Sequence, residues 1–485
     1  MTHEELLRQP FATLPDLVRL HAGQRPRHRA LVQDERVLDY EALDRLVDRI
    51  AASLQRDGVR PREAVAICAA MSIEYAAMFV GILRAGACVA PLSPSATAGQ
   101  LEAMVKDSGA RILFRDADLQ GLERWLVAEG TKPAPVEIEP DWPFNIIYSS
   151  GTTGTPKGIV QPHAMRWMHI RRSAITGYDP DAITLLSTPL YSNTTLVSFI
   201  PTLAFGATAI LIEKFDAAGY LALAEKHRVT HTMLVPVQYQ RLMALPDFDR
   251  YDLSSFRVKT CTSAPFPAAL KADVLKRWPG RLYDVYGLTE GGGTCVLDCT
   301  AHPDKLHTSG KPVAGHDIRL IDEQGREVAP GEAGEVVGHS PGMMTGYHNQ
   351  PEKTREAEWF DATGKRFIRT GDIGRFDAEG FLTLVDRKKD MIISGGFNIY
   401  PSDLEAVVRR HPAVAEVAVV GVPSEKWGET PVAYVVKKEA VSEEALLAWA
   451  NERLGKTQRL AAVRFLDALP RSPIGKVLKR ELRAH

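Results

Sequence analysis

The sequence is poor in cysteine and lacks a long apolar run, and each absence excludes a class of protein. Five cysteines among 485 residues are too few and too scattered for a disulfide framework, so a reducing compartment is expected. The apolar stretch YAAMFVGIL, residues 75–83, is bounded by Glu74 and Arg84 and is too short to span a bilayer. The N-terminal segment MTHEELLRQP has no apolar core of the kind that a secretory signal needs. We therefore expect a cytoplasmic protein without a transmembrane segment.

An excess of charge of one sign is also absent. The chain has 59 Lys and Arg residues against 60 Asp and Glu residues, a formal net charge of -1, so nucleic-acid binding has no electrostatic support. Hydrophobic residues make up 45% and charged residues 25%, which is typical of a globular protein. The length corresponds to roughly three units of ordinary domain size, and no convincing internal repeat is present.

The apolar periodicity alternates between helical and extended patterns. In DYEALDRLVDRIAASLQRDG, residues 39–58, the apolar side chains share one helical face, and Gly58 suits the end of the helix. The run AVAICAA from Ala64 indicates a strand buried on both sides, and Ser72 is a candidate cap for the next helix. Similar runs recur as FNIIY, ITLLST, ATAILIE, VTHTMLVP, RVKTCTS and RLYDVYG. This alternation predicts parallel sheets covered by helices.

The pattern changes from about Asp317 onward. DIRLIDEQGREV and GRFDAEGFLTLVD indicate hairpins with glycine-containing turns. A charged run, DRKKD at residues 386–390, precedes a segment with its own strand, VAEVAVVGV, and helix, EEALLAWANERLG. We predict an N-terminal domain of residues 1–388 and a C-terminal domain of residues 389–485. As an alternative, the charged run is a solvated turn, as most charge runs are.

A loop rich in glycine and hydroxyl groups follows one of the predicted buried strands. The stretch YSSGTTGTPKG, residues 148–158, offers backbone N–H groups, hydroxyls and the Lys157 ammonium, which together can cradle an anion. Lys157 is followed by Gly158 rather than by Ser or Thr, so the loop lacks the Walker form of P-loop NTPases. On composition alone, an ordinary flexible loop is an equal alternative to a phosphate site.

Three further segments contain residues suited to a nucleotide site. YDVYGLTE, residues 283–290, offers Tyr286 for stacking on a base and Glu290 as an oxygen ligand for Mg²⁺, just beyond a predicted strand end. RTGDIG contains Asp372, and RSPIGKVLKREL contains Lys476. Taken singly, these three residue types indicate a core aromatic, a turn former and a surface lysine.

Together with the loop, these segments closely resemble the AMP-forming, ATP-dependent acyl-CoA synthetases. These belong to the adenylating superfamily, which includes firefly luciferase and peptide-synthetase adenylation domains. The resemblance extends from about Asp16 to the end, with the motifs in the right order and spacing. It implies an α/β fold with a large N-terminal region of helix-covered sheets, made of α/β subdomains plus a small β-rich subdomain, and a smaller, mobile α+β C-terminal domain. The implied enzyme is an acid–thiol ligase that forms an acyl-adenylate and then a thioester of CoA.

The resemblance also assigns residues to the ATP site. ATP contacts are expected from Ser149, Ser150, Gly151, Thr152, Thr153, Gly154, Thr155, Lys157, Ser263, Ala264, Pro265, Asp284, Val285, Tyr286, Gly287, Thr289, Asp372 and Arg387. The expected catalytic groups are Lys476, Glu290, Thr289 and Lys157. Glu290 is the expected ligand of Mg²⁺, with Thr152 as a second candidate, and Lys389 matches the hinge. ATP, Mg²⁺ and coenzyme A are the implied cofactors and co-substrates.

The acyl pocket is expected to be lined by Tyr191, Ser192, Asn193, Gly287, Gly291 and Gly292. The family often has a histidine or a bulky aromatic residue where this chain has Ser192, and Gly291 to Gly293 also lack side chains. Either the site is roomier, suiting a medium-chain or long-chain fatty acid or an aryl or arylalkenoic acid, or neighbours such as Phe266 and Trp167 compensate. Glycine can also serve backbone geometry alone. Asn193 offers no charge for an α-ammonium, which disfavours an amino acid and favours an uncharged acid.

The expected CoA contacts are Gly395, Gly396, Trp427 and Arg459. Near Arg459 the segment TQRL, residues 457–460, lacks the aromatic residue and the lysine usual in the family. A stand-alone enzyme that loads an acyl-carrier protein is therefore kept as an alternative. Luciferase-like oxygenation has no distinguishing residue, and a non-catalytic nucleotide-binding protein is disfavoured because the motif residues are intact. A homodimer is compatible with the sequence.

One cluster has a spacing that resembles a zinc site. Cys295, Cys299, His302 and His307 are spaced C-x3-C-x2-H-x4-H, which resembles a zinc-ligand pattern. Such spacings also arise by chance in long enzymes, and chance placement is the favoured interpretation here.

Overall fold

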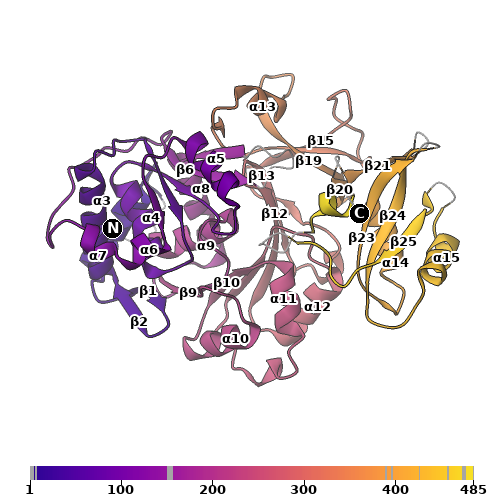
Figure 1. Ribbon diagram of the computed structural model, residues 1–485, viewed down its shortest axis with the longest axis horizontal. Coiled ribbons are helices and arrows are strands. Elements are labelled where there is room, and N and C mark those ends of the chain that lie inside the picture. The colour runs from indigo at the N-terminus through magenta and orange to yellow at the C-terminus, as the bar shows by residue number, and fades with distance from the viewer. Residues whose placement is uncertain are drawn as a thin grey trace. The chain divides into compact units, whose positions relative to one another are not determined.

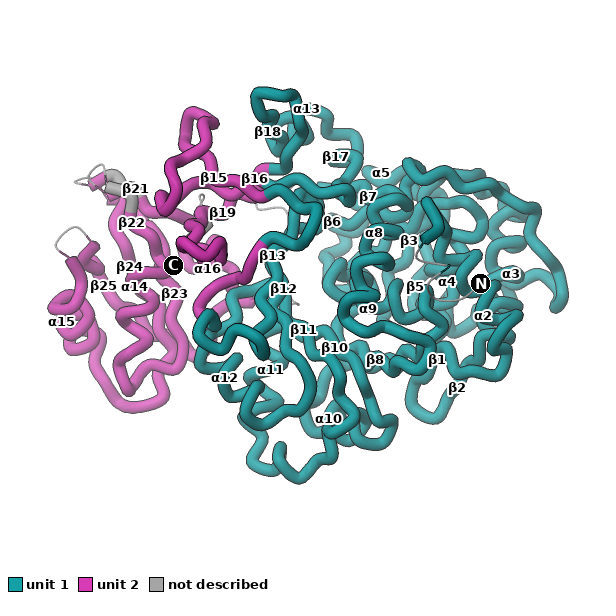
Figure 2. Tube along the Cα trace, turned by 180° about the vertical axis from the view of Figure 1, so that it is seen from behind, with its two compact units in different colours: residues 1–306, 312–317, 338–368 teal, residues 307–311, 318–337, 369–485 magenta. Residues whose placement is uncertain are grey.

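The computed structural model describes residues 5, 8–149, 157–387, 390–394, 397–424, 427–455, 458–471 and 477–483 (Figure 1). The chain divides into two compact units (Figure 2). The first comprises residues 1–306, 312–317 and 338–368, and the second residues 307–311, 318–337 and 369–485. The predicted hinge, Lys389, lies outside the described residues, so the domain boundary there stays a prediction.

A nine-stranded sheet has the strand order β14-β13-β12-β11-β10-β8-β9-β1-β2. The strands are β1 (Arg29–Gln33), β2 (Arg36–Asp39), β8 (Ile183–Leu186), β9 (Thr208–Leu211), β10 (His231–Leu234), β11 (Val258–Cys261), β12 (Arg281–Leu288), β13 (Gly291–Asp298) and β14 (Lys311–Pro312). Strands β1, β9, β8, β10, β11 and β12 run parallel to their neighbours in that series. The β1–β2 and β12–β13 pairs are antiparallel, so the expected parallel sheet has antiparallel additions.

A six-stranded sheet has the order β17-β7-β6-β4-β3-β5. Its strands are β3 (Ala64–Cys68), β4 (Cys88–Pro91), β5 (Leu113–Arg115), β6 (Pro143–Ser149), β7 (Lys157–Pro162) and β17 (Gly346–Tyr347). Strands β6 and β7, which flank the glycine-rich loop, pair antiparallel, with Ser149 opposite Lys157. The short strand β17 then pairs antiparallel with β7, which positions Tyr347 beside the lysine end of β7.

Helices cover these two sheets. They are α2 (Leu14–Gln24), α3 (Tyr40–Arg56), α4 (Ile73–Arg84), α5 (Ala98–Ser108), α6 (Asp116–Gln120), α7 (Leu122–Trp125), α8 (His163–Ser173), α9 (Asn193–Ala204), α10 (Ala217–Lys226), α11 (Pro236–Met243), α12 (Ala268–Arg277) and α13 (Pro351–Glu356). Figure 1 shows α10, α11 and α12 grouped beside strands β10 and β12. The predicted cap is confirmed, because Ser72 Oγ accepts a hydrogen bond of 3.1 Å from the Tyr75 N–H. Helix α4 is buried along its whole length and belongs to the main apolar core with residues of α2, α3 and α9.

The later part of the chain forms two five-stranded sheets. The strands are β15 (Asp317–Ile321), β16 (Gly334–His339), β18 (Glu358–Phe360), β19 (Arg366–Phe376), β20 (Leu382–Arg387), β21 (Ile392–Ser394), β22 (Phe397–Ile399), β23 (Val414–Ser424), β24 (Gly428–Lys437) and β25 (Ala462–Phe465). The first sheet has the order β15-β16-β19-β18 with β20 on β19, and the second β22-β21-β24-β23 with β25 on β24. Helices α14 (Pro401–Val408), α15 (Glu443–Arg453) and α16 (Lys479–Leu482) accompany the second sheet. The predicted strand VAEVAVVGV is β23, and the predicted helix EEALLAWANERLG is α15. The predicted hairpin GRFDAEGFLTLVD is the β19–β20 pair.

The predicted α/β fold class is confirmed. A larger N-terminal region of helix-covered sheets precedes a smaller C-terminal α+β region, and each has its own apolar core. Among the described residues, no helix combines the length and the apolar character that crossing a membrane requires.

Candidate functional site

Three polar side chains of the first unit meet at the lysine end of β7. Tyr347 Oη donates a hydrogen bond of 2.9 Å to Oε1 of Glu290, and Lys157 Nζ lies 5.1 Å from the centroid of the Tyr347 ring. Burial, followed by the Glu290 charge, raises the pKa of the Tyr347 phenol, so the hydroxyl stays a donor. The fold thus brings together Lys157 and Glu290, two predicted catalytic residues, through a tyrosine that the sequence analysis missed.

Glu290 lies just beyond the end of β12, as predicted, in the turn that leads into β13. Asp284 to Leu288 lie inside β12, and Thr289 and Glu290 form the reversal into β13. The Met344 N–H donates a hydrogen bond of 2.8 Å to the Glu290 carbonyl. The backbone of this turn is therefore fixed from the segment that leads into β17.

The glycines after Glu290 are required by the backbone. Gly291, Gly292 and Gly293 have φ values of 80°, 75° and 102°, in the left-handed region that favours glycine. A Cβ on Gly291 would lie 2.4 Å from the Gly342 carbonyl oxygen, and one on Gly292 would lie 2.5 Å from Ile368 Cβ. This close approach explains the glycines whatever the substrate, so they give no information about pocket size, and their place in the acyl pocket stays a prediction.

A buried polar network lies behind Thr289 and Asn193. Gln161 Nε2 donates hydrogen bonds to the Thr289 carbonyl at 2.6 Å and to Asn193 Oδ1 at 3.3 Å. Asn145 Nδ2 donates to Gln161 Oε1 at 2.8 Å, and the guanidinium of Arg166 donates to the same oxygen. The network links a predicted catalytic residue to a predicted acyl-pocket residue. Gln161 and Asn145 are polar positions within apolar strand patterns, which is the signal that could have revealed them.

Ser192 and Ser263, both predicted site residues, have local structural partners. Ser192 is the N-cap of α9, where its Oγ accepts a hydrogen bond of 3.3 Å from the Thr194 N–H. Ser263 has a φ of 79°, and its hydroxyl lies 2.6 Å from Thr194 Oγ1. The segment that contains Ala264 and Pro265 is thereby tied to the start of α9 next to Tyr191.

The two segments predicted to hold adenine are neighbours in the sheet. Strands β11 and β12 are parallel, with Cys261 opposite Asp284, and Thr262 Oγ1 donates a hydrogen bond of 2.8 Å to the Val285 carbonyl. The Asp284 carboxylate is 2.6 Å from Lys271 Nζ. Burial raises the pKa of Asp284, and Lys271 opposes that rise. Asp284 therefore contributes a buried ion pair beneath the segment that includes Tyr286 and Gly287.

In the second unit, Asp372 and Arg387 occupy opposite positions of the β19–β20 ladder. The Asp372 side chain is buried. The backbone N–H of Asp372 donates a hydrogen bond of 3.0 Å to Thr370 Oγ1. Trp427 is 49% exposed and precedes Gly428, whose register partner on β21 is Ser394. Arg459 is exposed. The structure does not describe Ser150, Gly151, Thr152, Thr153, Gly154, Thr155, Lys389, Gly395, Gly396 and Lys476, so predictions on those residues lie outside its scope.

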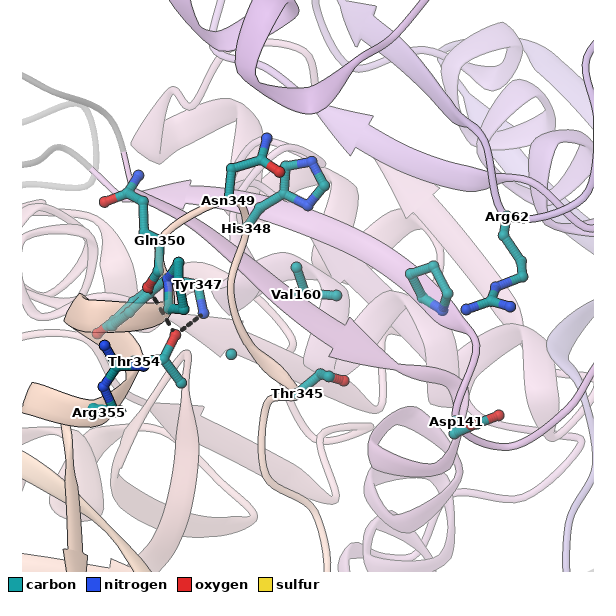
Figure 3. Close-up of a pocket in the computed structure, with 13 residues that line it drawn as sticks. Arg62, Asp141, Val160, Thr345, Tyr347, His348, Asn349, Gln350, Thr354 and Arg355 are labelled. Carbon is teal, nitrogen blue, oxygen red and sulfur yellow. Dashed lines mark hydrogen bonds between the residues drawn. The ribbon is translucent and has the colours of Figure 1, made fainter.

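A pocket of about 590 Å³ opens on the first unit (Figure 3). It is lined by residues of β7 and β17 and of the segment after β17, among them Tyr347, His348 and Thr354, with Arg62 and Asp141 on the other side. Among the described residues, none of those predicted for ATP, acyl or CoA contact lines it. Tyr347 is shared by the pocket and by the Lys157–Glu290 group, so the pocket adjoins that group without marking the nucleotide site itself.

The cysteines of the zinc-like spacing are buried side chains. Burial raises the pKa of the Cys295 and Cys299 thiols to about 12, which opposes the thiolate form that binds metals. The described residues contain no group of three or more His, Cys, Asp or Glu side chains with metal-binding geometry.

Comparison with known proteins decides the family. The AMP-binding enzyme family matches residues 18–348. The chain belongs to the AMP-binding enzymes. The C-terminal domain of AMP-binding enzymes also matches, over residues 403–476. This AMP-binding enzyme is 35% identical to a feruloyl-CoA synthase from an Amycolatopsis species, over 92% of this chain and 93% of that protein. It is 34% identical to a long-chain-fatty-acid–CoA ligase of Mycobacterium tuberculosis, over 96% of this chain and 97% of that protein.

A solved structure extends the comparison to the fold. The o-succinylbenzoate CoA synthetase of Bacillus subtilis, in complex with its acyl-adenylate intermediate, superimposes with a TM-score of 0.85 at 27% identity, covering 97% of this chain and 98% of that chain. The resemblance stated from the sequence is therefore confirmed. The AMP-binding enzyme is an AMP-forming acid–thiol ligase, and acid–CoA ligation is its reaction class.

Proposed function

We propose that this AMP-binding enzyme converts a carboxylic acid, ATP and CoA into an acyl-CoA, AMP and pyrophosphate in two steps. In the first, the substrate carboxylate attacks the α-phosphorus, the bond to the β-phosphate breaks, and pyrophosphate leaves an acyl-adenylate behind. In the second, the CoA thiol loses its proton, its sulfur bonds to the acyl carbon, and AMP departs. The first step needs no protein base, because the carboxylate is itself the nucleophile. Catalysis then depends on positioning and on charge stabilisation.

The observation that supports this function best is the grouping of Lys157, Tyr347 and Glu290. A cation and a carboxylate held within one polar group suit a nucleotide phosphate and its Mg²⁺, which prefers carboxylate oxygens. Tyr347 binds one oxygen of Glu290, which orients the carboxylate, and a Mg²⁺ contact through the second oxygen is compatible with this arrangement. We assign Lys157 to the phosphates, Glu290 to Mg²⁺ and Thr289 to the α-phosphate.

The remaining assignments follow the family resemblance. The segment from Ser149 to Thr155 and Lys157 is assigned to the β- and γ-phosphates, with Thr152 as a second candidate Mg²⁺ ligand. The adenine is assigned to Ser263–Pro265 and to residues 284–287, a reading that the β11–β12 contact supports. Asp372 is assigned to the ribose hydroxyls, Arg387 to the ribose or a phosphate, and Lys476 to the attacking carboxylate and the α-phosphate.

The acid is a medium-chain or long-chain fatty acid or an aryl or arylalkenoic acid. The relatives named above act on acids of both kinds, by their names. The acyl wall is assigned to Tyr191–Asn193 with Gly287, Gly291 and Gly292. CoA is assigned to Gly395, Gly396, Trp427 and Arg459, and the exposed indole of Trp427 supports this part.

A half-reaction experiment tests the proposal. With ATP, Mg²⁺ and a panel of fatty and aromatic acids, the enzyme should exchange labelled pyrophosphate into ATP in an acid-dependent way and should form AMP when CoA is added. Lys476→Ala should lower adenylate formation about 10²–10³-fold, as removal of a well-placed transition-state donor does, yet use supplied acyl-adenylate and CoA normally. Equal loss in both half-reactions would refute the role of Lys476. AMP formation that requires a carrier protein instead of CoA would favour the carrier-loading alternative.

The hinge is tested separately. Lys389→Pro should leave adenylate formation nearly intact and block thioester formation, because proline restricts backbone rotation at that position. Thioester formation at the normal rate in this variant would place the hinge elsewhere.

A further inference from the structure

One face of α8 carries three basic side chains into the first unit. Arg166, His169 and Arg172 follow one another at intervals of three residues, so they lie on one side of the helix. Arg166 is 1% exposed, and its Nη1 lies 3.4 Å from His169 Nδ1. His169 and Arg172 keep part of their accessible surface, although burial lowers the pKa of both groups. His169 and Arg172 are therefore only partly enclosed by the protein.

Neither arginine has a carboxylate partner among the described residues. Arg166 donates to Asn145 Oδ1 at 3.1 and 2.9 Å and to Gln161, which are neutral amide oxygens. Arg172 donates one hydrogen bond of 3.0 Å, to Thr294 Oγ1, although a guanidinium has five N–H donors. Taking a cation out of water is costly unless a counter-charge or sufficient hydrogen bonds compensate.

Other buried cations of the chain are compensated more fully. Arg84 lies 2.7 Å from Asp44 and 2.9 Å from Asp48, and Lys271 lies 2.6 Å from Asp284. Lys259 has no carboxylate partner in the described ranges but donates to the carbonyls of three successive residues, 278–280. Arg172 differs from all of these because most of its donors have no partner in the described part of the chain.

Two histidine side chains lie in the same region. His316 and His339 interact electrostatically with this group. Burial, Arg172 and His339 lower the pKa of His316 to about 4, so its ring is neutral at physiological pH. His316 Nδ1 is buried and has no hydrogen-bond partner among the described residues. The region therefore combines two fixed positive charges with unused hydrogen-bonding capacity.

This basic face adjoins the residues assigned to the acyl pocket. Thr294, the acceptor for Arg172, is the cross-strand partner of Gly287, and a Cβ on Gly287 would lie 3.4 Å from Thr294 Oγ1. Arg166 is linked to Asn193 by Gln161, whose side chain hydrogen-bonds to both residues. The cations thus lie at two separate points of the predicted acyl wall.

We infer that the acid activated by this enzyme carries a second carboxylate, remote from the one that reacts with ATP, and that Arg172 binds it. Arg166 adds positive charge from behind, and His169 and His316 contribute neutral hydrogen-bonding groups. This inference rests on the proposed function and narrows its substrate class to dicarboxylic acids with an aliphatic or aryl body. It departs from the expectation of an uncharged acid, which rested on Asn193 alone.

The test uses matched pairs of acids that differ only in the second carboxylate. Suitable pairs are hexanoic and adipic acid, octanoic and suberic acid, and cinnamic and 4-carboxycinnamic acid, each assayed with ATP, Mg²⁺ and CoA for kcat/KM of AMP formation. In at least one pair, the dicarboxylic acid should exceed its partner by about 10²-fold, because only the second carboxylate can form an ion pair with the partly enclosed Arg172. Monocarboxylic acids used as well as or better than their partners in every pair would overturn this inference alone. No AMP formation with any acid would overturn the proposed function and this inference with it.

Variants then locate the contact. Arg172→Gln should lower kcat/KM for the preferred dicarboxylic acid by about 10²-fold and change that for its monocarboxylic partner less than about threefold, while Arg172→Lys should recover part of the loss. Arg171→Gln is the matched control, because Arg171 is the adjacent, exposed residue of α8, and it should change neither value. Equal loss with both acids in Arg172→Gln would overturn the inference, and the comparison of acids on the unmodified enzyme stands even if a variant fails to fold.

Discussion

The phenol of Tyr347 holds the carboxylate of Glu290 through a hydrogen bond of 2.9 Å, while the Lys157 ammonium lies 5.1 Å from the same aromatic ring. Tyr347 comes from β17, Lys157 from β7 and Glu290 from the β12–β13 turn. A two-residue strand thus joins a sheet edge to a hairpin turn, and its tyrosine orients the two charged groups that we assign to the phosphates and Mg²⁺.

Removing this hydroxyl should weaken the use of Mg²⁺. We expect Tyr347→Phe to lower the rate of acid-dependent pyrophosphate exchange about 10-fold or more and to raise the Mg²⁺ concentration for half-maximal rate, because hydrogen bonds to charged groups contribute about 1.5–3 kcal/mol. The aromatic ring is retained in this variant, so the cation–π contact with Lys157 should persist. In a Glu290→Gln background, Tyr347→Phe should add little further loss. Fully additive losses would mean that the tyrosine acts independently of Glu290.

The Lys271–Asp284 pair should matter for stability. Lys271→Met leaves the buried Asp284 carboxylate without its cation, and breaking such a pair costs about 3–5 kcal/mol of unfolding free energy. Because burial raises the pKa of Asp284, the folded state binds a proton at this group more tightly than the unfolded chain does. The deficit should therefore grow as pH rises above about 4, the ordinary pKa of aspartate. Urea unfolding at several pH values measures this, and Lys271→Met/Asp284→Asn should be more stable than Lys271→Met. A double variant less stable than the single one would contradict the pairing.

Histidine burial should make stability fall on acidification. His231 is buried, and burial lowers its pKa to about 4, against opposing contributions that include the Thr176 carbonyl and Asp179. A lowered pKa means that stability is fully present above the ordinary value of about 6.5 and is lost as pH falls toward 4. At pH 5 this one group should cost about 2 kcal/mol of unfolding free energy. His231→Gln should reduce the difference in unfolding free energy between pH 7.5 and pH 5. The exposed His307 is the control, and His307→Gln should leave that difference unchanged.

Replacing a glycine of the β12–β13 turn should harm folding rather than selectivity. We expect Gly292→Ala to lower the unfolding free energy by about 2 kcal/mol or more, because its φ is positive and the new Cβ would meet Ile368 Cβ at 2.5 Å. Gly130→Ala isolates the conformational part, since Gly130 has a φ of 82° but no atom within 4 Å of a new Cβ, and it should cost about 1 kcal/mol. A stable Gly292→Ala enzyme with altered preference among acids would show instead that Gly292 lines the acyl pocket.

Local patterns predicted much of the fold correctly. Asp39 caps the helix that begins at residue 40, the buried strand at Ala64 is β3, and Ser72 caps α4. These elements follow from periodicity and from short-range hydrogen bonds, which a sequence displays directly. The antiparallel pairs β1–β2 and β12–β13 were not predicted, although each joins strands that are adjacent in sequence. Tyr286 and Gly287, expected just beyond a strand end, lie inside β12, because this strand continues to Leu288 before the turn into β13.

The candidate site could be predicted only in part. Lys157 and Glu290 stand out by chemistry and by their motif, and their proximity agrees with that reading. Tyr347 and Gln161 were not predicted, because each is an isolated polar residue whose role depends on a contact distant in sequence. Gln161 contacts Thr289 across 128 residues of chain, and Tyr347 contacts Glu290 across 57.

The sequence by itself determined the reaction class, because adenylation needs particular side chains in a fixed order and the chain retains them. Tertiary structure decided what surrounds those side chains. It showed that Gly291 and Gly292 are required by backbone contacts and that Ser192 caps a helix. It also showed that Arg172 donates to Thr294 and has no carboxylate partner among the described residues. The physical reason is that packing sets both the burial of a side chain and the groups that it contacts. The sequence alone therefore does not show whether the counter-charge of an arginine belongs to the protein or to a substrate.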